Sequence, residues 1–222
     1  MNALSPRHDL MTAWCLSLLV GACAAAPPTP SATPAAPSPA EASPAAAVEA
    51  AHDHHGQSGP IAIPDGALFT EADVHFMQGM IAHHAQAIHM SRMAPARGAD
   101  ERLVRFARKI DFSQAGEIVL MQGWLRANGQ VAPDTSSWRT MTMPGMLTAA
   151  DLARLEAARG RAFDRLFLEY MIRHHEGALQ MVADLLDDPR AAQDIDVSVL
   201  ANDIATVQTA EIGLMRQMLA EL

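Results

Sequence analysis

The sequence contains very little cysteine: Cys15 and Cys23 are the only two in 222 residues, and both lie near its start. The rest of the chain therefore offers no thiol for a disulfide, a Cys-x-x-Cys redox pair or a thiolate metal site. The chain also lacks an excess of positive charge: its formal net charge is −9, and no stretch of the sequence is strongly basic. A phosphate backbone would be repelled, which argues against nucleic acid as a partner.

A hydrophobic run long enough to span a membrane is missing from the N-terminal segment as well. The apolar run from Leu10 to Ala22 follows Arg7 and is shorter than the roughly 20 residues that a membrane-spanning helix needs. This pattern predicts a signal peptide over residues 1–22 and export from the cytoplasm.

The end of the signal peptide, Leu-Val-Gly-Ala followed by Cys23, resembles a bacterial lipobox, in which the cysteine is lipidated and becomes the mature N-terminus. We therefore expect a periplasmic protein or a membrane-anchored lipoprotein that contacts the membrane only through its lipid. The alternative is an ordinary signal peptide cleaved within residues 24–26, which would remove Cys23.

Residues 23–64 form the next segment, which is rich in Ala and Pro and cannot bury enough apolar surface to fold. We interpret it as a tether. It ends in a His-rich patch at residues 52–55, which either captures metal loosely or is a solvated spacer. One folded domain is expected over residues 65–222.

That domain contains an internal repeat. Residues 73–90 align without gaps with residues 164–181, and residues 107–125 align with residues 201–219. The repeated unit is a hairpin of two helices, over about residues 70–128 and 161–222.

Capping signals mark where the helices begin. Thr70 with Asp73 and Thr148 with Asp151 both resemble capping boxes. The sequence predicts helices at about residues 71–93, 100–128, 149–186 and 191–221, the third with a break near Gly160. The long connection over residues 129–147 predicts an all-α, ferritin-like four-helix bundle made of two repeated hairpins with a long crossover loop.

Helical periodicity directs chemistry-bearing side chains into this bundle. The first and third helices each place a His-His pair on the inward face, with methionines one turn before and two turns after it. The second and fourth helices each place a glutamate and a methionine inward. The candidate ligands are His83, His84, His174, His175, Met80, Met90, Met171, Met181, Glu117, Met121, Glu211 and Met215.

Four inward histidines indicate a metal site, because burying them without partners costs free energy that a bound ion offsets. Imidazole suits copper and zinc, whereas thioether sulfur favours Cu(I), and methionine is abundant at 14 residues. Copper, as Cu(I) or Cu(II), is therefore the predicted ion and zinc the alternative. A purely structural or pH-sensing bundle remains open, because single Met and His residues usually fill cores or hold structure. The loop methionines Met141, Met143 and Met146 form either a transient Cu(I) site or a lid.

These residues resemble a known family. The doubled motif, the Met-Pro-Gly-Met loop and the Gln-x-x-Glu-Ile pattern of the fourth helix are similar to the bacterial domain of unknown function number 305, over about residues 65–222. The resemblance implies a ferritin-like helical bundle that is exported, and some members are associated with copper binding and copper tolerance.

An enzyme of the ferritin-like class is the competing hypothesis. Di-iron bundles need a Glu-x-x-His motif on each of two helices, and the only one here joins Glu49 to His52 in the tether. We therefore expect a non-enzymatic protein that sequesters a metal ion or transfers it, with a copper-delivery protein or further copies of itself in a homo-oligomer as the candidate partners.

Overall fold

A computed structural model describes residues 60–222, so the predicted signal peptide, Cys23 and most of the tether lie outside the described residues. The described part is all helical, without a strand, and confirms the predicted fold class. None of its helices is long and apolar enough to cross a membrane. The α-helices are α1 (Glu71–Ser91), α2 (Glu101–Ala127), α3 (Ala149–Ala157), α4 (Gly160–Asp187) and α5 (Ile195–Ala220).

The helices begin where polar side chains can accept their first free N–H groups. Both predicted capping boxes are present, at Thr70 before α1 and at Thr148 before α3. Asp100 and Asp194 cap α2 and α5 in the same way. The predicted third helix is two helices, because residues 158 and 159 are extended and Gly160 adopts φ +54°, a value that favours glycine.

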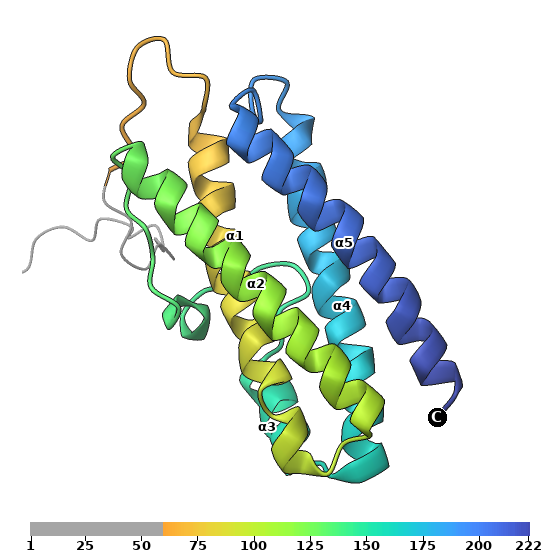
Figure 1. The fold of residues 1–222 in the computed structure, drawn as a ribbon. Helices are drawn as coiled ribbons and strands as arrows, with labels where there is room; N and C mark the ends of the chain where they lie inside the picture. The colour runs from red at the N-terminus through yellow and green to blue at the C-terminus, as the bar shows by residue number, and fades with distance from the viewer. Residues whose placement is uncertain (1–59) are drawn as a thin grey trace, which may run out of the picture. The chain divides into compact units, whose positions relative to one another are not determined.

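Two antiparallel hairpins make up the bundle. Helix α1 pairs with α2, α4 pairs with α5, and α1 packs against α4 between the hairpins (Figure 1). The apolar core falls into two clusters along the bundle. One contains Phe76, Ile81 and Val197, and the other contains Phe106, Phe163 and Phe167.

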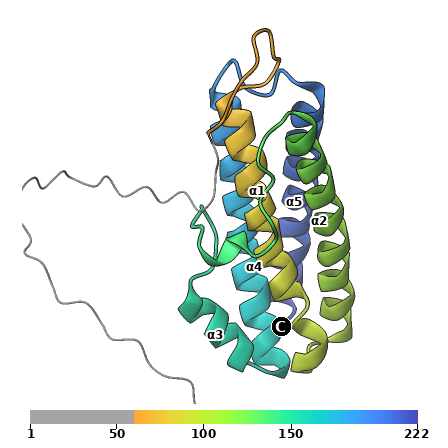
Figure 2. The same ribbon diagram turned by 90° about the vertical axis from the view of Figure 1, so that its left-hand side faces the viewer.

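The crossover connection covers a face of α1 that periodicity assigns to solvent. It runs along α1 before reaching α3 (Figure 2). Gln78 donates to the carbonyl of Val131 at 2.8 Å, while the Gln86 side chain both donates to and accepts from the backbone of Leu147. Both glutamines are buried, and sequence analysis did not identify their role. The connection is therefore fixed to α1 by side-chain amides.

Two buried carboxylates interlock the hairpins. Asp73 on α1 accepts from the backbone N–H of Ala192, in the α4–α5 turn, at 2.6 Å. Its counterpart in the repeat, Asp164 on α4, accepts from the backbone N–H of Asp100, in the α1–α2 turn. Ala192 has φ 52°, which is strained for a residue with a Cβ, and the bond to Asp73 helps to hold it.

Replacing Asp73 with Ala should lower the free energy of unfolding by about 2–4 kcal/mol, because it removes a helix cap and leaves a buried N–H without its acceptor. Asp151→Ala is the matched control, since Asp151 completes the same kind of capping box but binds no turn of the other hairpin. That control should cost about 1 kcal/mol. Equal losses in denaturant unfolding would contradict the interlock.

Candidate metal centre

A layer of polar side chains separates the two apolar clusters. On α2, α4 and α5, the polar residues lie between the stretch that belongs to one cluster and the stretch that belongs to the other, and on α1 the histidine pair lies between Met80 of one cluster and Met90 of the other. All members of the layer are buried except Glu117, whose side chain is 17% exposed. Its members are His83 and His84 on α1, Gln114 and Glu117 on α2, His174 and His175 on α4, and Gln208 and Glu211 on α5.

The centre of the layer is a pair of stacked imidazoles, one from each hairpin. The rings of His83 and His174 have centroids 3.8 Å apart and are tilted by 41°. The Nε2 atom of His83 lies 3.0 Å from the carbonyl oxygen of Pro144, in the crossover connection. Neither ring nitrogen of His174 has a hydrogen-bond partner.

Each outer histidine is bonded to a glutamate of its own hairpin. The Nε2 atom of His84 lies 2.5 Å from Glu117, and that of His175 lies 2.9 Å from Glu211. The two pairs are equivalent in the repeat. Carboxylates orient ligating histidines in this way at many metal sites, because they fix the ring and leave the other nitrogen for the ion. Here that other nitrogen is Nδ1.

Several buried polar atoms of the layer have no hydrogen-bond partner. Five imidazole nitrogens lack a hydrogen-bond partner: Nδ1 of all four histidines and Nε2 of His174. Both amide atoms of Gln114 and the amide oxygen of Gln208 are also unpaired. A buried unsatisfied group costs about 1–3 kcal/mol, so an ion bound through ring nitrogens would remove a substantial penalty.

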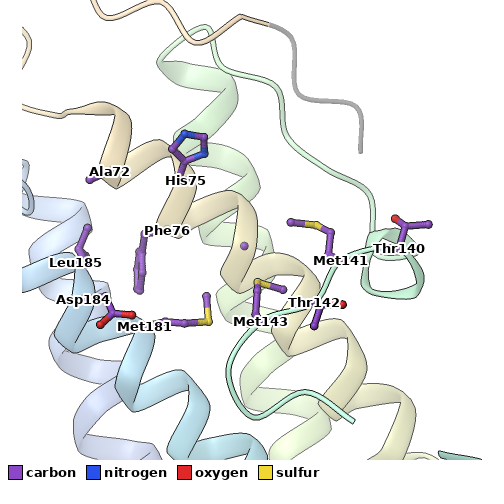
Figure 3. Close-up of a pocket in the computed structure, with 11 residues that line it drawn as sticks. Ala72, His75, Phe76, Thr140, Met141, Thr142, Met143, Met181, Asp184 and Leu185 are labelled. Atoms are coloured by element: carbon purple, nitrogen blue, oxygen red, sulfur yellow. The ribbon is translucent and has the colours of Figure 1, made fainter. Parts of the chain in front are cut away.

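Thioether groups flank the layer on both apolar sides. Met80 and Met121 belong to one cluster, whereas Met90, Met171 and Met215 belong to the other, and all five are fully buried. Met181 departs from this pattern although it is the repeat counterpart of Met90. It is only partly buried and lines a pocket at the surface (Figure 3).

The side chains do not form a complete coordination shell as they lie. Within residues 60–222, no three His, Cys, Asp or Glu side chains converge in a metal-holding arrangement. The unpaired nitrogens and the nearby sulfurs are nonetheless the donors that copper prefers. An ion would require an imidazole to rotate away from its present contact, or a methionine to complete the set.

Burial lowers the pKa of three of these rings, His83, His174 and His175, and so favours their neutral form. It lowers the pKa of His83 from 6.5 to about 3, with a further contribution from the nearby His84. It also places the pKa of His174 well below the usual value, aided by His83 and the other histidines. The pKa of His175 is lowered by burial too, against the opposing effect of Glu211. A neutral imidazole is the form that binds metal.

Sequence analysis missed the close contact that brings the connection to His83. A Cβ at Gly177, in the middle of α4, would lie 2.0 Å from the carbonyl oxygen of Pro144. A Cβ at Gly145, which has φ +78°, would lie 2.5 Å from the backbone of Arg173. Glycine at both positions lets the two backbones touch. The signal that could have indicated this contact is the presence of two glycines, Gly177 inside a helix and Gly145 in the Met-Pro-Gly-Met loop.

The metal-free protein should lose stability as the pH falls from 6.5, the ordinary histidine pKa, towards about 5. In that range histidines of the unfolded chain bind protons, whereas the buried rings of the folded protein do not. Each such ring lowers the free energy of unfolding by up to about 1.4 kcal/mol per pH unit. Denaturant unfolding at several pH values measures the slope. His83→Leu with His174→Leu should flatten it, whereas an unchanged slope in that variant would contradict the assignment.

Comparisons with known proteins agree with this architecture. The family model described as Domain of unknown function (DUF305) matches residues 73–219. A DUF305 protein from Streptomyces coelicolor, named as secreted, is 31% identical, with 68% of this chain and 93% of that chain covered and a TM-score of 0.60. Among curated proteins, none matches the chain significantly.

Two further solved structures share the fold. A DUF305 fragment from Deinococcus radiodurans is 32% identical, covering 69% of this chain and 99% of the fragment, with a TM-score of 0.62. CopM in its Cu(I)-bound form is 30% identical, covering 67% of this chain and 96% of CopM, with a TM-score of 0.55. Other CopM structures hold Cu(II) or Ag. The family model spans well over half of this sequence, and the chain therefore belongs to the DUF305 family.

Proposed function

We propose that this protein is an exported copper-binding protein that holds the ion in the polar layer between its two hairpins. The observation that carries the proposal is the set of buried imidazoles with unpaired nitrogens, two of them oriented by Glu117 and Glu211. CopM, which resembles this chain over most of its own length, has been solved with Cu(I), Cu(II) and Ag. The buried thioethers favour Cu(I) over harder ions.

Sequestration or transfer of copper fits this layer better than catalysis does. The four histidines are fully buried, which would protect a bound ion and would keep a substrate from reaching them. The two glutamates of the layer are each bonded to a histidine of the same hairpin, and no described helix carries the Glu-x-x-His motif of di-iron bundles. Zinc is the competing ion, because histidine and glutamate also suit it.

The repeat predicts that both hairpins contribute ligands. The double variants His83→Ala with His84→Ala and His174→Ala with His175→Ala should each lower bound copper by at least about half while keeping the helix content. Metal analysis after dialysis and circular dichroism measure the two quantities. His89→Ala is the control, since His89 lies on the same helix but pairs with Glu156 outside the layer, and its loss should leave bound copper unchanged.

Normal copper loading in both double variants would contradict the site. A loss of zinc equal to the loss of copper, at matched free concentrations, would instead identify a histidine site without copper preference. The two ions can be compared on the same variants, which separates the existence of the site from the choice of metal.

Export is supported by the relative named as secreted and by the signal-like N-terminus. We propose that Cys23 carries a lipid anchor. Replacing Cys23 with Ala should then move the protein from the membrane fraction to the soluble fraction or block its processing. Fractionation followed by mass measurement of the N-terminus checks this, and unchanged membrane association with full signal removal would contradict it.

A further inference from the structure

A second group of methionines lies outside the polar layer. Met141 and Met143 from the crossover connection and Met181 from α4 line one pocket of about 750 Å³ beside the first half of α1. All three are partly buried rather than enclosed in the core. Figure 3 shows the side chains of Met143 and Met181 extending towards each other across the pocket. Met181 also packs against the apolar cluster that contains Phe76, but core filling does not account for the two loop thioethers at this cavity.

A glycine in the floor of the pocket makes space for two of these side chains. A Cβ at Gly79 would lie 3.1 Å from the sulfur of Met143 and 3.3 Å from the terminal methyl of Met181. Gly79 lies inside α1, where glycine costs about 1 kcal/mol relative to alanine. Its repeat counterpart on α4 is Tyr170, so the repeated hairpin does not itself require glycine at this position. Glycine at this position therefore leaves space in the pocket and does not stabilise the helix.

The charge around the pocket suits a cation. Asp184 and His75 both line the pocket (Figure 3), and Asp184 contributes a carboxylate. The whole chain is acidic, with a formal net charge of −9, so cations are drawn towards it. Thioether sulfur binds soft monovalent ions, Cu(I) and its analogue Ag(I), in preference to Zn(II).

The pocket is also next to the buried layer. Met143 precedes Pro144, whose carbonyl oxygen contacts His83, and Gly79 precedes His83 by one helical turn. A loop movement at Met143 would therefore displace the contact that covers His83. The same short segment connects the surface thioethers with the enclosed imidazoles.

We propose that Met141, Met143 and Met181 form a separate surface site for a soft monovalent cation, where Cu(I) binds before it reaches the polar layer. The proposal deepens the proposed function and rests on it for the identity of the ion and its destination. Binding at the pocket itself does not depend on the layer. The three sulfurs supply the donors, and Gly79 leaves the space that Met143 and Met181 occupy side by side.

The test uses the full chain with ¹³C-labelled methionine methyl groups and Ag(I) as a diamagnetic probe. The methyl signals of the three pocket methionines should shift together on addition of Ag(I) and not on addition of Zn(II). In Met143→Leu, the signals of Met141 and Met181 should require about tenfold more Ag(I) to shift, because one donor is lost. Met146→Leu is the matched control, since Met146 lies in the same loop but not in the pocket.

A second variant perturbs the pocket without removing a sulfur. Gly79→Ala places a methyl group where the Met143 sulfur and the Met181 methyl now meet, so Ag(I) affinity at the pocket should fall several-fold. Circular dichroism confirms that α1 is retained. Unchanged Ag(I) binding in both Gly79→Ala and Met143→Leu would overturn the site, as would an equal loss in Met146→Leu.

The variant His83→Ala with His174→Ala separates this proposal from the proposed function. Pocket signals that still shift with Ag(I) in that variant would support an independent surface site. Pocket signals that stay still while those of Met80 and Met171 shift in the parent would overturn the surface site and leave the buried layer supported. Pocket shifts that require intact layer histidines would also overturn a separate site.

Discussion

The burial of four imidazoles in one layer is the constraint on which the rest of the structure depends. Neutral histidines enclosed between apolar clusters can be stable only if their nitrogens find partners, and the chain supplies Glu117, Glu211 and the Pro144 carbonyl for three of them. Five ring nitrogens remain unpaired. That unmet capacity destabilises the metal-free fold, and an ion bound through the ring nitrogens would relieve this cost.

The sequence repeat makes the two hairpins equivalent, whereas the crossover connection makes different contacts with each of them. Equivalent residues form equivalent contacts at the His-Glu pairs and at the two aspartates that hold the opposite turns. The connection packs on one side only, so α1 is covered by amide contacts and α4 by a backbone contact at Gly177. The contact between the connection and His83 therefore has no counterpart at His174, whose ring nitrogens have no hydrogen-bond partner.

Helical periodicity predicts which face of each helix a residue occupies, and it identified the inward histidines, the paired glutamates and the buried methionines. Capping chemistry likewise placed the starts of α1 and α3. Periodicity carries no information on the path of a connection, so the roles of Gln78 and Gln86 and the surface position of Met181 could not be predicted. Side-chain rotation is equally hidden, and the stacking of His83 on His174 depends on it.

The most direct test of the central claim is the position of copper in a crystal of the protein prepared with Cu(I). An anomalous difference map at the copper absorption edge locates the ion without assuming any ligand. The account predicts a peak in the polar layer, between α1 and α4 and within bonding distance of histidine nitrogens. Copper found only at sites outside the layer, with the imidazoles of His83 and His174 still stacked as they are here, would contradict it.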